Sequence, residues 1–238
     1  MTIVHAYFSP CGETKKLALY LHKHIGGPLI DLTSPFVRDT VVFSENTLLI
    51  LSLPVYSAQV VKPLLKVLEK VKSKWVVLNI SYGQMTYGSI IHQLKDMLPF
   101  STVLAYAITP TKHSYKDEMI EINYTHLDEI IKKVNDKSFT PCNIKTYKKA
   151  FGARFLESFR TRYNYKITIN KEDCTHCLKC IALCPVNAIP RDLTLSNTCI
   201  RCSRCVKECP ENVIHAKQSW FLKLYLRKPK NQDTIVSI

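Results

Sequence analysis

Eight of the ten cysteines in this chain lie between Cys174 and Cys209, in two runs that repeat one spacing. Each run reads C-x2-C-x2-C-x3-C-P. The first consists of Cys174, Cys177, Cys180 and Cys184, and the second of Cys199, Cys202, Cys205 and Cys209. A cubane [4Fe-4S] cluster needs four thiolates, and three within seven residues can wrap one cluster. The two runs therefore predict two [4Fe-4S] clusters.

The repeated spacing also predicts how the two clusters share their ligands. In two-cluster ferredoxins, the fourth cysteine of each run binds the cluster held by the other run. On that pattern one cluster is bound by Cys174, Cys177, Cys180 and Cys209, and the other by Cys199, Cys202, Cys205 and Cys184. Structural zinc favours separated C-x2-C pairs, and disulfides need an oxidising compartment, for which the sequence shows no secretion signal. We expect residues 171–217 to form a bacterial-type ferredoxin module, Cys142 to stay an unligated thiol, and the protein to be cytoplasmic.

Several ionisable side chains lie inside the two runs. His176 could tune a cluster by hydrogen bonding, but we expect it to be exposed. The cations are Lys179, Arg201, Arg204 and Lys207. They either raise the cluster potentials, contact an acidic partner, or are ordinary solvated charges, and the sequence leaves these alternatives open.

The first half of the chain alternates apolar runs with amphipathic ones. Strands are expected at residues 2–8, 28–32, 47–53, 74–80 and 101–108, and helices at 15–24, 60–72, 87–98 and 125–134. The run at 47–53 is almost entirely apolar, as a parallel strand buried on both faces should be. Strands that alternate with helices favour an α/β fold with a doubly wound five-stranded parallel sheet.

Ligands of such sheets bind beyond the carboxyl ends of the strands, so the loops there are the candidate site. The first loop consists of Ser9, Pro10, Cys11, Gly12, Glu13 and Thr14; the later ones contain Pro54, Val55, Tyr56 and Ser57, then Ser81, Tyr82, Gly83 and Gln84, with Tyr87 beyond. Small residues and hydroxyls before a helix suit a phosphate, or else form an ordinary turn capped by Thr14. The tyrosines could hold a planar ring between them, or simply pack locally.

Together these loops resemble those of flavodoxin. Ser9-x-Cys11-Gly12-x-Thr14 is similar to the flavodoxin phosphate loop S/T-x-T-G-x-T, and the two later loops resemble those that flank the isoalloxazine ring of FMN. With the cysteine runs, the chain resembles the flavodoxin-fused ferredoxin (EFR-type) family over nearly its whole length. The resemblance implies a flavodoxin-like fold that binds FMN through the loop residues named above, followed by a small α+β two-cluster ferredoxin domain.

The phosphate loop departs from the family pattern at two positions. Cys11 stands where threonine is usual and removes a hydroxyl donor to the phosphate. Glu13 places a carboxylate where the family often has Asn or Thr. A third departure follows the second loop, where this chain has Ala58-Gln59 and the family often has Gly-Arg. These changes are expected to weaken FMN binding without abolishing it.

Charge is distributed unevenly along the 238 residues, whose formal net charge is +14. Residues 1–137 contribute +3 and residues 138–238 contribute +11. We expect a flavodoxin-like domain at 1–137, a basic linker helix at 138–165, the ferredoxin domain at 166–218 and a basic amphipathic tail at 219–238 that docks on the chain's own surface. No apolar run reaches the length of a membrane span, which leaves open only a weak peripheral membrane contact.

These observations predict an electron carrier rather than a substrate-specific enzyme. FMN exchanges one or two electrons and each cluster exchanges one, so together they could split electron pairs. The sequence has no G-x-G-x-x-G, which argues against an NAD(P)H site. The positive surface suits acidic redox partner proteins, and no nucleic acid is expected as a partner. Two alternatives are a flavin-dependent reductase of a small substrate, and a redox or oxygen sensor whose flavodoxin-like half is an empty docking domain.

Overall fold

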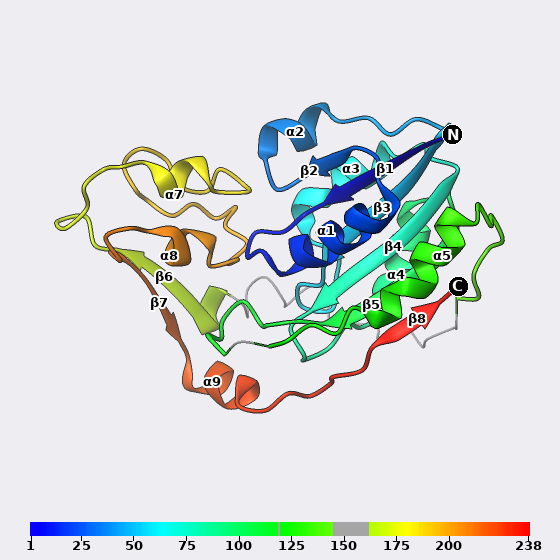
Figure 1. Cartoon of the computed structure of the whole chain (residues 1–238). Helices are drawn as coiled ribbons and strands as arrows, with labels where there is room; N and C mark the ends of the chain where they lie inside the picture. The colour runs from blue at the N-terminus through cyan, green and yellow to red at the C-terminus, as the bar shows by residue number, and fades with distance from the viewer. Residues whose placement is uncertain (119, 145–161) are drawn as a thin grey trace. The chain divides into compact units, whose positions relative to one another are not determined.

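The structure is a computed structural model of the chain, and it describes residues 1–118, 120–144 and 162–238 (Figure 1). The chain forms two compact units. Unit 1 comprises Met1–Lys149 and Lys230–Ile238, and unit 2 comprises Ala150–Pro229. The expected linker helix falls largely on residues 145–161, which lie outside the described residues. Within the described part, no helix is both long enough and apolar enough to cross a membrane.

Unit 1 is an α/β domain built on one six-stranded sheet. Its strands are β1 (Thr2–Tyr7), β2 (Leu29–Asp31), β3 (Thr47–Pro54), β4 (Trp75–Tyr82), β5 (Thr102–Pro110) and β8 (Ile235–Ser237). Its helices are α1 (Glu13–Ile25), α2 (Pro35–Thr40), η1 (Lys62–Leu64), α3 (Leu65–Glu69), α4 (Ile90–Met97), η2 (Thr125–Leu127) and α5 (Asp128–Asn135). The strand order is β2-β1-β3-β4-β5-β8. The first five strands are parallel and have the flavodoxin-like order, which confirms the expected fold.

The sheet is held in register by apolar residues that lie side by side. Val4 pairs with Leu49, Leu49 with Val76, and Val76 with Val103. All eight residues of β3 are buried, because helices cover both faces of a parallel sheet. Figure 1 shows α1 and α5 in front of the sheet and α3 and α4 behind it. This packing fixes the carboxyl ends of β1, β3 and β4, from which the candidate flavin loops start.

The sixth strand was not expected from the sequence. β8 pairs antiparallel with β5, and its register places Ile235 beside Ile108 and Ser237 beside Tyr106. An uncovered edge strand exposes unpaired N–H and C=O groups, and β8 satisfies them along part of β5. Residues 219–238 therefore contribute to both units rather than forming one tail.

Unit 2 contains a two-stranded antiparallel sheet and short helices. Its strands are β6 (Tyr165–Ile169) and β7 (Ile214–Gln218), and its helices are α7 (Lys179–Ala182), α8 (Arg204–Glu208) and α9 (Trp220–Leu226). Helices α7 and α8 contact each other, and each begins just before the third cysteine of its run. Unit 2 is thus a small α+β domain arranged around the two cysteine runs.

Candidate iron–sulfur centres and flavin loops

The backbone conformation around the first cysteine run recurs 25 residues later, around the second run. Positive φ angles occur at the matching pairs His176 (53°) and Arg201 (56°), and Leu178 (59°) and Ser203 (64°). Left-handed backbone is uncommon for residues with a side chain, so its recurrence at matching positions marks a required bend. Each bend lies between successive cysteines and turns the chain around the same kind of centre.

Backbone N–H groups donate to cysteine sulfurs at the same matching positions. His176 N–H donates to Cys174 Sγ and Arg201 N–H donates to Cys199 Sγ, both at 3.4 Å. Ala188 N–H also donates to Cys184 Sγ at 3.1 Å. Hydrogen bonds of this kind stabilise thiolates and influence the potential of a bound cluster. His176 is exposed, as expected.

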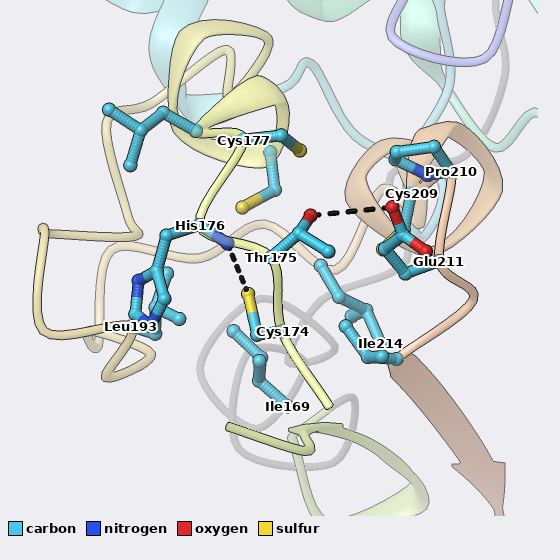
Figure 2. Close-up of a pocket in the computed structure, with 13 residues that line it drawn as sticks. Ile169, Cys174, Thr175, His176, Cys177, Leu193, Cys209, Pro210, Glu211 and Ile214 are labelled. Atoms are coloured by element: carbon cyan, nitrogen blue, oxygen red, sulfur yellow. Dashed lines mark hydrogen bonds between the residues drawn. The ribbon is translucent and has the colours of Figure 1, made fainter. Parts of the chain in front are cut away.

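The structure brings together all four cysteines of the first predicted ligand set. One pocket of unit 2 is lined by Cys174, Cys177, Cys180 and Cys209, with apolar cover from Ile169, Leu193, Val213 and Ile214 (Figure 2). Cys209 belongs to the second run, so this pocket combines cysteines of both runs. Among the described residues, no three His, Cys, Asp or Glu side chains converge closely enough to hold a single metal ion. A cubane cluster takes each thiolate on a different iron, so its ligands need not meet at one point.

Electrostatic interactions also link cysteines of the second predicted set. Burial, foremost, together with the neighbouring Cys199 and Cys184, raises the pKa of Cys205 to about 12. Cys184 comes from the first run, yet it interacts with Cys205 of the second. Cys202, the fourth member, is buried. A thiol whose pKa is this high needs a positive centre to become a thiolate, which iron supplies when it binds.

A partly buried cation beside the second set bears on whether these residues suit an anionic group. Arg201 lies between Cys199 and Cys202, and its Nε and Nη1 atoms are buried without a hydrogen-bond partner in the described part of the chain. Unpaired buried charge is costly, whereas a cluster with four thiolates carries about −2 by formal counting. An anionic cluster in this place would balance Arg201, so the residues fit the group.

The three flavin loops of unit 1 meet at the carboxyl edge of the sheet. Thr14 Oγ1 and Ser81 Oγ lie 2.7 Å apart and join the first and third loops. Val55 N–H donates to Ser81 O at 2.8 Å and joins the second loop to the third. In the second loop, Tyr56 and Gln59 close a tight turn across the positive φ angles of Ser57 and Ala58. The structure therefore brings the three candidate loops together at one edge of the sheet.

The first loop fits a phosphate through its backbone better than through its side chains. Gly12 has φ +89°, and no atom lies within 4 Å of the position that a Cβ would take, so this side of the loop is open. The hydroxyl of Ser9 already accepts the N–H of Lys15 at 2.9 Å, and that of Thr14 already contacts Ser81. Glu13 Oε1 forms a salt bridge with Lys16 Nζ at 2.7 Å. The other carboxylate oxygen, Oε2, is buried with no hydrogen-bond partner among the described residues.

The third loop contacts the C-terminal segment of unit 1, a contact that no sequence pattern indicates. The Tyr82 ring is buried, and its hydroxyl lies 2.7 Å from Asp233 O and 2.9 Å from Asn231 Oδ1. Lys230 N–H and Asn231 N–H both donate to Gln84 O. Tyr82 is therefore a structural support of this loop, and its ring meets the half-buried Tyr87 edge to face at 5.3 Å. Tyr56 and Tyr87 remain the aromatic candidates beside a flavin.

Comparison with known proteins bears mainly on unit 2. Residues 167–189 and 196–215 match the family described as the 4Fe-4S binding domain, and these stretches contain all eight cysteines of the two runs. Comparison with curated proteins gave no match. Among solved structures, the chain is similar to a flavoprotein from Lactobacillus acidophilus NCFM, crystallised in complex with FMN. The identity is 15% and the TM-score 0.37, over 45% of this chain and 92% of that one. Unit 2 thus carries a 4Fe-4S binding domain, and unit 1 has the flavodoxin-like strand order described above.

Proposed function

We propose that this protein is an electron carrier that holds two [4Fe-4S] clusters in unit 2 and FMN on unit 1. The observation that carries the proposal is the pocket that gathers Cys174, Cys177 and Cys180 from one run with Cys209 from the other. Each bound cluster supplies one-electron redox chemistry, and FMN supplies one- or two-electron chemistry. The chain's own residues bind these groups and donate backbone N–H groups to the cysteine sulfurs.

The second ligand set supports the same proposal. Cys205 interacts electrostatically with Cys180 of the first set as well as with members of its own, so the two centres are neighbours. Proximity of this kind favours electron transfer within unit 2. The flavin part rests on three loops that meet at one edge of the sheet and on the open side of Gly12. Acidic redox proteins are the proposed partners, because the net charge is +14 before cofactors are counted.

The cluster assignment is tested by iron analysis of anaerobically purified full-length variants. We expect about eight iron and eight sulfide per chain, and about four after Cys174→Ser or Cys209→Ser. The crossed pattern further requires that these two substitutions remove the same cluster signal in electron paramagnetic resonance, and that Cys184→Ser removes the other. Cys142→Ser is the matched control, since this half-buried thiol lies outside both runs and should leave eight iron. Loss of different clusters in the Cys174 and Cys209 variants would refute the crossing.

The flavin assignment is tested by titrating FMN into the same full-length protein and following the quenching of flavin fluorescence. We expect one FMN per chain. Glu13→Gln should bind FMN more tightly, because it removes a carboxylate beside a phosphate that carries about −2. Glu69→Gln on α3 is the matched control, since it lowers the acidic charge by the same amount elsewhere. Absence of binding in all three proteins would leave an iron–sulfur protein with an empty flavodoxin-like domain, the sensor alternative.

A further inference from the structure

The two cysteine runs differ at one matched position in a way that affects charge. His176 and Arg201 lie 25 residues apart, share a left-handed backbone and donate equivalent N–H···S bonds to the first cysteine of their runs. His176 is exposed, whereas Arg201 has two guanidinium nitrogens buried without a hydrogen-bond partner among the described residues. The backbone repeat is thus nearly symmetric, and the burial of charge is not.

We infer that Arg201 makes the two clusters inequivalent, by raising the reduction potential of the cluster bound by Cys199, Cys202, Cys205 and Cys184 above that of the other. This inference rests on the proposed function. It concerns which centre accepts an electron first, and it assigns that preference to one side chain.

The reach of the side chain limits how far the charge lies from the sulfurs. The backbone nitrogen of Arg201 is 3.4 Å from Cys199 Sγ, and an arginine side chain spans roughly 6–7 Å. The guanidinium therefore lies within about 10 Å of this sulfur. The Nε and Nη1 atoms of Arg201 are buried, so their charge is less screened by salt than the charges of the exposed Lys179 and Lys207. The side chain of Lys179, for example, is half exposed. Its Nζ lies 3.2 Å from Glu208 Oε2, and this carboxylate offsets its charge.

The direction of the effect follows from the charge change on reduction. One-electron reduction of a four-thiolate cluster takes its formal charge from about −2 to −3, with no bond made or broken and no proton required. A fixed cation nearby stabilises the more negative state more strongly, which raises the potential. At an effective dielectric constant of about 20 and 10 Å, the interaction favours reduction by more than tenfold. A tenfold change corresponds to 59 mV for a one-electron couple.

The test is an anaerobic redox titration of the full-length protein with dithionite, monitored by electron paramagnetic resonance. We expect two resolved couples in the wild-type protein. Arg201→Gln should lower the upper couple by about 59 mV or more. Arg201→Lys, which keeps the charge, should retain most of the separation. His176→Gln at the matched position should move neither couple by as much.

A gain-of-charge variant keeps the inference testable if Arg201→Gln prevents assembly of the second cluster. His176→Arg should then raise the lower couple, although less than the native arginine affects its own cluster, because this site is exposed. If Arg201→Gln retains eight iron and both potentials are unchanged, the inference is wrong while the proposed function stands. If His176→Gln shifts its couple as much as Arg201→Gln does, the inference is also wrong. An iron content far below eight in the wild-type protein would instead overturn the proposed function.

Discussion

Replacing Tyr82 with phenylalanine should loosen the segment 230–238 from the rest of unit 1. The Tyr82 hydroxyl has one hydrogen to donate and lies 2.7 Å from Asp233 O and 2.9 Å from Asn231 Oδ1, so it ties the third candidate flavin loop to this segment. Burial, foremost, and the charge of Asp233 raise its pKa, so the hydroxyl stays protonated and remains a donor throughout the physiological range. Phenylalanine keeps the buried ring and removes only this hydroxyl, which isolates the hydrogen bonds from the packing.

Two contributions set the expected destabilisation of the segment in Tyr82→Phe. A neutral hydrogen bond contributes about 1 kcal/mol, and a desolvated acceptor left without a donor costs about 1–3 kcal/mol. We expect about 2 kcal/mol in the local opening equilibrium, which is roughly a thirtyfold increase in the open population. Asn231 Oδ1 still accepts the N–H of Asp233 at 2.7 Å, so the full upper value is not expected.

Hydrogen exchange followed by mass spectrometry measures this change directly. Peptides covering residues 230–238 should exchange about thirtyfold faster in Tyr82→Phe, while a peptide covering α5 serves as the internal control and should be unchanged. Exchange within threefold of the wild-type rate would refute the reasoning, since it would mean that β8 pairing and the backbone hydrogen bonds to Gln84 hold the segment without the phenol. Faster exchange in α5 as well would point to global destabilisation instead.

Three further predictions concern the stability of unit 1. Burial, foremost, lowers the pKa of His5 to about 4, so below about pH 6.5 the unfolded chain binds a proton that the folded chain does not. In urea unfolding, His5 should contribute about 1.3 kcal/mol less stability at pH 5.5 than at pH 7.5, and His5→Leu should remove this contribution. The difference that remains comes from other groups such as His126, whose pKa burial also lowers. Gly88→Ala should lower the melting temperature, because a Cβ at φ +57° would lie 2.6 Å from the Cβ of Ala58; an unchanged melting temperature would contradict the predicted clash. Ile50→Ala, at a fully buried site in the core cluster, should cost about 2–5 kcal/mol in the free energy of unfolding, and a cost below 1 kcal/mol would show that the core collapses around the cavity.

Local patterns made most of the fold and the cluster site predictable. Cysteine spacing acts over a few residues, so the runs themselves indicate the geometry that turns the chain around a cluster. The apolar run at β3 likewise predicts a strand buried on both faces. Strand β8 escaped prediction because a three-residue strand has no periodicity to detect, and its pairing with β5 spans well over a hundred residues.

The candidate flavin site was predicted less completely, for the same reason. The loops around Ser9, Val55 and Ser81 follow strand ends, and strand ends follow from local apolar runs. The role of Tyr82 depends on Asn231 and Asp233, which lie about 150 residues away and have no sequence signature. The burial of Arg201 was equally hidden, because its sequence neighbours resemble those of the exposed cations in the same runs.

The position of β8 has a consequence for how the chain is made. The ribosome synthesises about 125 residues, including all eight cysteines of the two runs, between the end of β5 and the start of β8. At about 5–20 residues per second, this interval lasts roughly 6–25 s. During it, a nascent flavodoxin-like sheet has no β8 to cover β5, and an uncovered strand is a template for pairing with other chains. Strand β5 therefore stays uncovered until the whole cysteine-rich segment has been synthesised, and chaperones are expected to bind it during this interval.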